Sequence, residues 1–143
     1  MAAIVTSVEK TTLVLNGTAI NDYASGDIIT LTPVNPVSSH VNGSNGSVNI
    51  NERSDRDVYD LTIRVLRMTD SDSFLNNVMR TSPITVLNGS LKENFTKDNV
   101  DNIESWILEN GSIITQPTIT INNEDGNGLV EYVVRFRKAT RNI

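Results

Sequence analysis

Hydrophobic and polar residues alternate most regularly in two segments of the chain. Within residues 58–68 every second residue is apolar, namely Tyr59, Leu61, Ile63 and Val65. The pattern returns within residues 129–137 with Val130, Tyr132, Val134 and Phe136. Successive side chains of a strand point to opposite faces of a sheet, so each segment is predicted to be a strand with one core face and one largely polar face.

Further extended runs, rich in β-branched residues, lie at 11–15, 27–33, 47–53, 105–115 and 118–122. In the run 47–53, Val48 and Ile50 are predicted to face the core, with Asn49 and Asn51 on the opposite face. Six Asn-Gly pairs begin at Asn16, Asn42, Asn45, Asn88, Asn110 and Asn127. Asn-Gly favours tight hairpin turns, so a meandering antiparallel protein of six to eight strands is expected.

One segment departs from the strand pattern. Residues 70–80 begin with Asp and Ser, which favour helix starts, and carry an apolar stripe of Phe74, Leu75, Val78 and Met79. This spacing predicts a single three-turn helix that packs its stripe on the sheet. Residues 96–105 have capping residues but few apolar ones, so they are predicted to be a loop or a short helical turn.

Two polar stretches look too long for hairpin turns. Residues 34–46, which directly follow Pro33, carry one proline, Pro36, and two Asn-Gly pairs, and are predicted to be a loop that projects from the body. Residues 88–102 are rich in charge and are predicted to be a solvated excursion. With both segments included, the 143 residues are expected to form a single domain.

Composition and charge exclude several classes of function. The chain has no cysteine and one histidine, so disulfide frameworks, thiolate zinc sites and multi-histidine metal sites are excluded. Its net charge of −5 does not suit a protein that grips nucleic acid by its phosphates. No apolar run reaches the length that a membrane-spanning helix requires, so no membrane span is expected.

The candidate chemistry is weak. His40 has no Asp or Glu within five residues, and no nucleotide-binding glycine motif is present. Residues 122–128 offer several oxygen ligands but lack the pattern of a calcium loop, so a polar hairpin tip is the preferred interpretation. The charged segment 52–57 is interpreted as a solvated turn or a subunit contact. We therefore expect no enzymatic activity, no metal and no cofactor.

Residues 41–79 contain an ordered series of features: Gly43 and Gly46, a short polar strand at 47–53, a charged turn at 54–57, Leu61-Thr62 in a long strand, and the capped start 69–73 of a helix. In this order they resemble the central block of the tail tube proteins of contractile-tailed bacteriophages, a family that includes the inner tubes of contractile injection systems. Further on, Ser105-Trp106-Ile107 and Pro117 are similar to a later strand of that family. Residues 88–102 match nothing in the family pattern.

The resemblance implies a mainly β fold, an antiparallel β-sandwich or barrel with one flanking helix. It also implies a structural virion protein whose hexameric rings stack into the inner tail tube and conduct DNA during ejection. Implied partners are further copies of the chain, the sheath outside, the tape measure protein and DNA in the lumen, and the baseplate and tail terminator at the ends. The implied locations are the phage virion and, during assembly, the host cytoplasm.

Within this interpretation, residues can be assigned to surfaces. The weakly amphipathic runs 27–33 and 47–53 are the best candidates for the channel lining, through Thr30, Thr32, Asn49 and Asn51. Ile29 and Leu31 would then face the core. The polar loop 34–46 is the candidate for ring stacking, through Asn35, His40, Asn42 and Asn45.

Two other classes share the turns and the alternation. A monomeric β-sandwich module for binding or adhesion would more often expose aromatic side chains, and this chain has one Trp, three Tyr and three Phe. A small-ligand barrel is disfavoured for the same reason.

Overall fold

The structure, a computed structural model, describes residues 2–123 and 126–143. Its elements are β1 (Ile4–Leu15), β2 (Thr18–Ile20), β3 (Ile29–Pro33), β4 (Ser38–Asn42), β5 (Val48–Glu52), β6 (Tyr59–Leu66), α1 (Asp70–Arg80), β7 (Leu87–Lys97), β8 (Val100–Thr115), β9 (Ile121–Asn122), β10 (Gly126–Asn127) and β11 (Leu129–Asn142). The predicted mainly β class with one flanking helix is confirmed. Among the described residues, no helix has both the length and the apolar character to cross a membrane.

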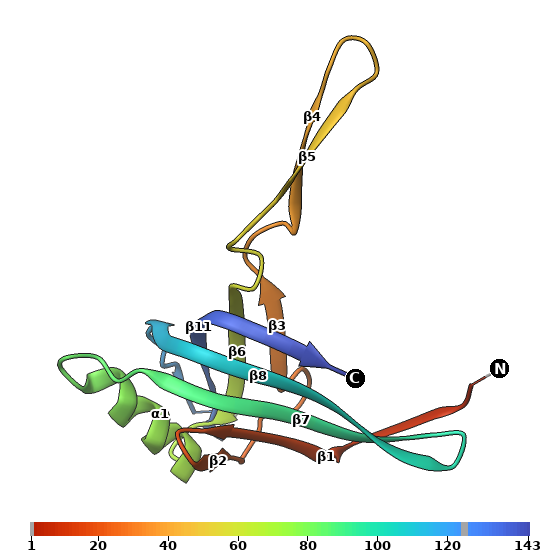
Figure 1. The fold of residues 1–143 in the computed structure, drawn as a ribbon. Helices are drawn as coiled ribbons and strands as arrows, with labels where there is room; N and C mark the ends of the chain where they lie inside the picture. The colour runs from red at the N-terminus through yellow and green to blue at the C-terminus, as the bar shows by residue number, and fades with distance from the viewer. Residues whose placement is uncertain (1, 124–125) are drawn as a thin grey trace.

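Seven antiparallel strands form one sheet in the order β2-β1-β7-β8-β11-β6-β3. Strand β11 holds the sheet together, because residues 129–136 pair with β6 while residues 133–142 pair with β8. Figure 1 shows the result: β3 and β6 run across the direction of β7 and β8, and α1 lies at one end. The sheet therefore folds over on itself and encloses one core.

The core is built from the alternating residues that the sequence predicts. Leu61, Ile63 and Val65 of β6 are fully buried, as are Val130, Val134 and Phe136 of β11. Leu13, Leu15 and Leu108 join them from the β1, β7 and β8 side. Where the two sides meet, the rings of Tyr59 and Trp106 pack edge to face with centroids 5.2 Å apart. One hydrophobic core thus connects both parts of the sheet.

Helix α1 spans Asp70–Arg80, the range that the apolar stripe predicts. Leu75 and Val78 are buried, whereas Phe74 and Met79 are only partly buried against the core. The Asp72 carboxylate accepts the Met68 N–H at 2.9 Å and the Tyr132 hydroxyl at 2.7 Å. Asp72 therefore ties Met68, which precedes the helix, to the first helical turn and also fastens the helix to β11.

The excursion predicted at 88–102 and the loop or helical turn predicted at 96–105 are both wrong. Residues 87–97 and 100–115 form the paired strands β7 and β8. The turn between them is only Asp98 and Asn99, both at positive φ (51° and 64°). Asp and Asn tolerate this backbone conformation without glycine, so a tight hairpin replaces the expected polar loop.

Two Asn-Gly pairs that were predicted as turns lie inside strands. Asn16 and Gly17 do form the β1–β2 turn, with φ of 49° and 79°. Asn88 and Asn110, however, continue a ladder from that turn: the Asn88 N–H donates to Asn16 Oδ1 and the Asn110 N–H to Asn88 Oδ1, each at 2.9 Å. These three residues, the asparagine ladder, use their side chains to connect neighbouring strands.

Two further strand predictions need correction. Only residues 121–122 of the predicted run 118–122 are in a strand. Val48 and Ile50, predicted to face the core, are 52% and 60% exposed, because β5 pairs with β4 and not with the main sheet. The predicted polar tip at 122–128 includes residues 124–125, which lie outside the described residues.

Candidate assembly surfaces

The most prominent candidate surface is the hairpin of β4 and β5. The segment expected as a loop at 34–46 contains β4, which pairs with β5 from Ser38↔Glu52 to Asn42↔Val48. We call residues 37–53 the arm. In Figure 1 the arm stands away from the body of the protein. Because its strands pair only with each other, the arm contributes no strand to the main sheet.

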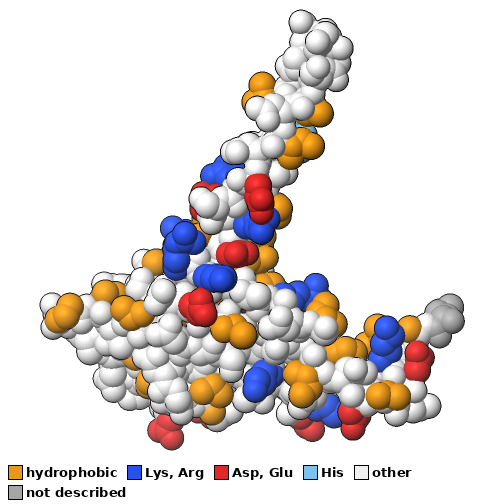
Figure 2. Space-filling view, viewed as in Figure 1, with side chains coloured by type: hydrophobic (Ala, Val, Ile, Leu, Met, Phe, Trp, Pro, Cys, Tyr) orange, Lys and Arg blue, Asp and Glu red, His pale blue; other side chains and the backbone are white. Residues whose placement is uncertain are grey.

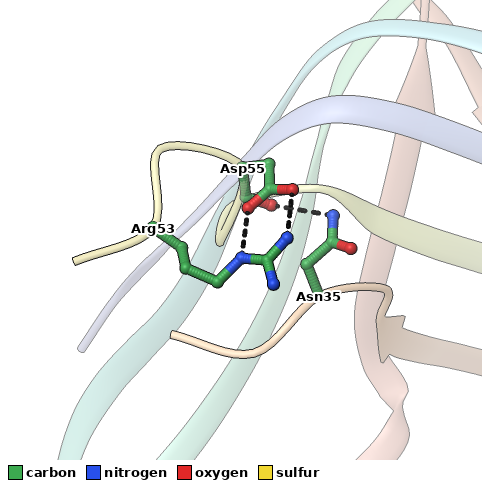
Figure 3. A network of polar contacts seen from close by, with 3 residues as sticks. All are labelled: Asn35, Arg53 and Asp55. Atoms are coloured by element: carbon green, nitrogen blue, oxygen red, sulfur yellow. Dashed lines mark hydrogen bonds and ion pairs between the residues drawn. The ribbon is translucent and has the colours of Figure 1, made fainter. Parts of the chain in front are cut away.

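Polar contacts fix the base of the arm, as Figure 3 shows. The Arg53 guanidinium donates two hydrogen bonds to the Asp55 carboxylate, at 2.9 and 2.8 Å. The Asn35 amide donates to the Asp55 carbonyl oxygen at 3.2 Å. The bonded Arg53 guanidinium holds the pKa of Asp55 below its ordinary value, and the pKa of Arg53 is raised in turn. A planar two-bond pair of this kind fixes direction as well as distance.

Both faces of the arm expose apolar side chains. Residues directly opposite each other in a hairpin share a face, so Val48 and Ile50 lie with Asn42 and His40, and Val41 lies with Asn49. The exposed fractions are 61% for Val37, 68% for Val41, 52% for Val48 and 60% for Ile50. Figure 2 shows hydrophobic side chains along the arm and charged side chains gathered at its base. An isolated two-stranded hairpin is at best marginally stable in water, so these side chains are suited to a partner surface.

A second surface is the outer face of β3, β6 and β11. Thr30 and Thr32 are exposed there, while Ile29 and Leu31 of the same strand pack on the core, as predicted. Thr32 lies beside Asp60, which forms an ion pair with Arg135 of β11 at 2.8 Å. This ion pair raises the pKa of Arg135, chiefly through the hydrogen bond to Asp60. We call this hydroxyl-rich area the polar sheet face.

The four residues assigned to a channel lining are not brought together within one chain. Thr30 and Thr32 lie on the polar sheet face, whereas Asn49 and Asn51 lie on the arm. The four residues assigned to stacking are spread along the arm and its base. Asn35 is at the base, His40 is midway along β4, and Asn42 and Asn45 are at the tip.

The free edge of β3 is a third candidate surface. Hydrogen bonds from Arg64 N–H to Ile28 oxygen and from Val34 N–H to Val58 oxygen, both 3.0 Å, flank the pairing of β3 with β6. Successive residues of a strand direct their N–H and C=O groups to opposite sides, so those of Ile29 and Leu31 point away from β6. In the part of the chain that the structure describes, no strand pairs with that side. The edge is therefore available for strand addition.

The sequence reading missed a further apolar surface around the β7–β8 turn. Exposed apolar side chains occur on both faces there: Ile4 and Val100 lie with Lys97 on one face, close to Ile143, whereas Val5 and Ile103 lie on the other. A groove beside them is lined in part by Phe95, Lys97 and Arg141, and Arg141 forms an ion pair with Glu104 at 2.9 Å. In the sequence, the pair Asp98-Asn99 was the feature that could have indicated a tight turn between two strands here. Within residues 2–123 and 126–143, no group of three or more His, Asp or Glu side chains is placed to hold a metal ion.

Comparison with known proteins shows a likeness in fold. No protein-family model and no curated protein sequence matches this chain. Its structure is similar to a chain in the cryo-EM structure of the anti-feeding prophage cap, described as the tube-terminating cap of that particle. The TM-score is 0.58, the sequence identity is 11%, and the match covers 96% of this chain and 90% of the other. The likeness extends over nearly the whole chain and concerns the fold.

Proposed function

We propose that this chain is a structural subunit of the inner tube of a contractile tail, and that its hexameric rings stack around a channel that conducts DNA. The observation that carries the proposal is the arm, which exposes Val37, Val41, Val48 and Ile50 on a fold similar to one found in a tube-terminating cap structure. The sequence resemblance to tail tube proteins points in the same direction. In this role the chain is not an enzyme and needs no cofactor.

Ring formation would use the free edge of β3. A strand of a neighbouring subunit could pair there with the backbone groups of Ile29 and Leu31. Pro33 ends this edge without an N–H, which limits how far such pairing extends. Heterologous pairing that closes on itself gives a ring, and it requires a second, different surface on each subunit to meet the β3 edge of its neighbour.

Stacking would use the arm. Its apolar side chains would be covered by a subunit of the next ring, with Asn35, His40, Asn42 and Asn45 as the polar contacts. The Arg53–Asp55 pair at the base would hold the arm at the angle that this contact requires. The outside of the tube would meet the sheath protein, and its ends would meet the baseplate and the tail terminator.

The channel would be lined by polar but weakly charged surface, with Thr30 and Thr32 on the sheet and Asn49 and Asn51 on the arm. On the polar sheet face Asp60 and Arg135 form an ion pair, and Arg64, Glu131 and Arg137 share that face, so it presents hydroxyls and charges of both signs. A surface whose Arg side chains are largely balanced by carboxylates gains little from counterion release and lets DNA slide. DNA and the tape measure protein would occupy this channel transiently, in the virion and during assembly in the host cytoplasm.

Negative-stain microscopy of the purified protein over a range of concentrations tests the proposal. We expect rings with a central hole at low concentration and stacked tubes at higher concentration, with matching sizes from solution scattering. Particles that stay monomeric at every concentration would contradict the proposal and favour the binding-module alternative.

A second candidate function is a subunit of the ring that closes the end of such a tube. The description of the similar structure as a tube-terminating cap favours it. A terminating ring would form single rings that bind tube ends and would not stack on itself. The same concentration series therefore separates the two candidates.

A further inference from the structure

We propose that Asn45, at the tip of the arm, is a site of spontaneous deamidation. In this reaction the backbone nitrogen of the next residue loses its proton to hydroxide and bonds to the side-chain Cγ. The bond from Cγ to Nδ2 then breaks, and the nitrogen leaves as ammonia after taking a proton from water. Water opens the resulting succinimide at either carbonyl and leaves an aspartate or an isoaspartate.

The attacking nitrogen at this site is poorly restrained. Glycine follows Asn45, so no side chain hinders the Gly46 nitrogen. The Gly46 N–H makes only a long hydrogen bond, 3.3 Å, to the Gly43 oxygen. A carbon built on Gly46 would have no neighbouring atom within 4 Å, so the surroundings are open to hydroxide and water.

The atom that gains charge during the attack is already hydrogen-bonded. Asn45 Oδ1 accepts the Ser47 N–H at 3.1 Å. As the Gly46 nitrogen bonds to Cγ, negative charge develops on this oxygen, and a donor already in place stabilises it. Ser47 thus acts as a positioning residue through its backbone N–H.

The Asn-Gly pairs at Asn42, Asn16 and Asn88 hold the asparagine amide or the following nitrogen differently and serve as internal controls. Asn16 shares with Asn45 an open following glycine and a backbone donor to Oδ1, but its Nδ2 is hydrogen-bonded as well. At Asn42, the nitrogen of Gly43 is held by a 2.7 Å hydrogen bond to the Ser47 oxygen. Asn16 is tied at both ends of its amide, to the Val86 oxygen at 3.0 Å and by the Asn88 N–H at 2.9 Å.

Asn88 is restrained in a different way. Its Oδ1 accepts the Asn110 N–H, and Gly89 sits in β7 so close to β1 that an added carbon would lie 1.9 Å from the Val14 oxygen. At Asn16 and Asn88 the amide is bonded to another strand, so moving Cγ toward the next nitrogen disturbs the asparagine ladder, whereas the donor to Asn45 Oδ1 lies only two residues further along the same turn.

The test is incubation of the full-length folded protein at mildly alkaline pH, followed by peptide mapping. Mass spectrometry detects the replacement of an NH₂ by an OH, and enzymatic methyl labelling detects isoaspartate. We expect Asn45 to react at least about tenfold faster than Asn16 and Asn88, which corresponds to about 1.4 kcal/mol in the barrier, with Asn42 between them. In denaturant the sites should react at similar rates.

Two variants sharpen the test. Asn45→Gln should remove the fast phase and leave the other sites unchanged. Ser47→Pro removes the donor to Oδ1 and should slow position 45 by about two- to tenfold, the effect of one hydrogen bond. Equal rates at all sites of the folded protein, a faster rate at Asn42, or an unchanged rate in Ser47→Pro would overturn the proposal.

A separate readout rests on the proposed function. If stacking covers the tip, Asn45 should react more slowly in assembled tubes than in dissociated subunits. Equal rates in tubes and subunits would count against the stacking role of the arm. The reaction in free subunits would be unaffected by that outcome, so the two failures are distinguishable.

Discussion

At the scale of single residues, the dipeptide Asn-Gly has two different structural roles in this protein. At Asn16 it forms a turn in which both residues have positive φ. At Asn88 the glycine is needed for space, because an added carbon on Gly89 would lie 1.9 Å from a backbone oxygen of β1. The asparagine then connects strands through its side chain. The dipeptide alone does not distinguish these roles. For this reason Asn88-Gly89 and Asn110-Gly111 were predicted as turns although they lie within strands.

Gly89→Ala is expected to destabilise the protein strongly, by about 3 kcal/mol or more, because the clash involves backbone that has little freedom to move. Urea unfolding monitored by circular dichroism measures the change. Gly128→Ala is the matched control, since nothing lies within 4 Å of its added carbon, and its effect should stay within about 0.5 kcal/mol. Similar values for both variants would show that β1 and β7 are not in such close contact.

The orientation of the arm is expected to depend on pH through Asp55. Arg53 lowers the pKa of this carboxyl, so the pair stabilises the arm at neutral pH. This stabilisation is present above the ordinary Asp pKa of about 3.9 and is lost as pH falls through the lowered value. Hydrogen exchange of the arm, followed as the pH is lowered, should show increased opening in the wild type.

The Asp55→Asn variant should open at neutral pH as well. Glu52→Gln is its control, because it removes the Glu52–Arg56 ion pair, whose side chains are more exposed (73% and 42%). That variant should behave as the wild type. An arm that exchanges equally in all three proteins would mean that the Arg53–Asp55 pair does not fix it.

At the scale of elements, the segments that could be predicted were those that bury one face of their side chains in the core. Strands β6 and β11 and helix α1 followed directly from apolar spacing, because one face of each is buried. Strands β4 and β5 have no buried face. The residues of β5 were predicted as a strand with its apolar side chains in the core, and those of β4 only as part of a projecting loop, so their hairpin was missed. Much of β7 was missed because its pairing depends on backbone hydrogen bonds and on the asparagine ladder. Neither produces a regular alternation of apolar and polar residues in the sequence.

Leu75→Ala in helix α1 is expected to cost about 2–5 kcal/mol, because this side chain is fully buried. Phe74→Ala should cost less than the 3–5 kcal/mol typical of a buried ring, since Phe74 is only partly buried. Denaturant melts of the two variants give the comparison. A larger loss for Phe74→Ala would mean that the helix packs with a different side toward the sheet.

Replacing residues 38–52 by Asn-Gly is expected to leave the stability of the body nearly unchanged and to abolish tube formation. The ends of this segment already meet, since the Arg53 N–H donates to the Val37 oxygen at 3.0 Å. Rings should still form, as judged by microscopy. The double variant Val41→Ser, Ile50→Ser keeps the hairpin and should also weaken stacking, whereas long tubes in both proteins would assign the arm another role.

At the scale of the whole molecule, the mainly β fold and the positions of its two regular core strands could be predicted, but the surfaces could not. The sequence grouped Thr30 and Thr32 with Asn49 and Asn51 because both runs alternate weakly. The structure separates them onto the polar sheet face and the arm. Whether either surface lines a channel depends on contacts between subunits, which alternation within one chain does not encode.

The variant Thr30→Lys, Thr32→Lys is expected to retain DNA in assembled tubes at low salt and to release it as salt rises. In a hexameric ring the two changes place about twelve cations around the channel, more than the 6–10 phosphate contacts that make binding strongly salt-dependent. Ejection assays on phage, or DNA retention by purified tubes, measure the effect. Asn49→Lys, Asn51→Lys is the paired comparison: retention there would place the arm in the channel as well, and free passage in both variants would place neither surface there.

Strand β11 has a consequence for how the subunit is made. It follows β6, β7 and β8 in the chain, yet it lies between β8 and β6 in the sheet. On the ribosome, the facing edges of β6 and β8 therefore stay unpaired until residues 129–142 emerge, and the core remains open along that line. A nascent or truncated chain that lacks this strand has two half-sheets with exposed edges. Such edges favour pairing with other chains, so unfinished chains are expected to need chaperones until this strand is in place.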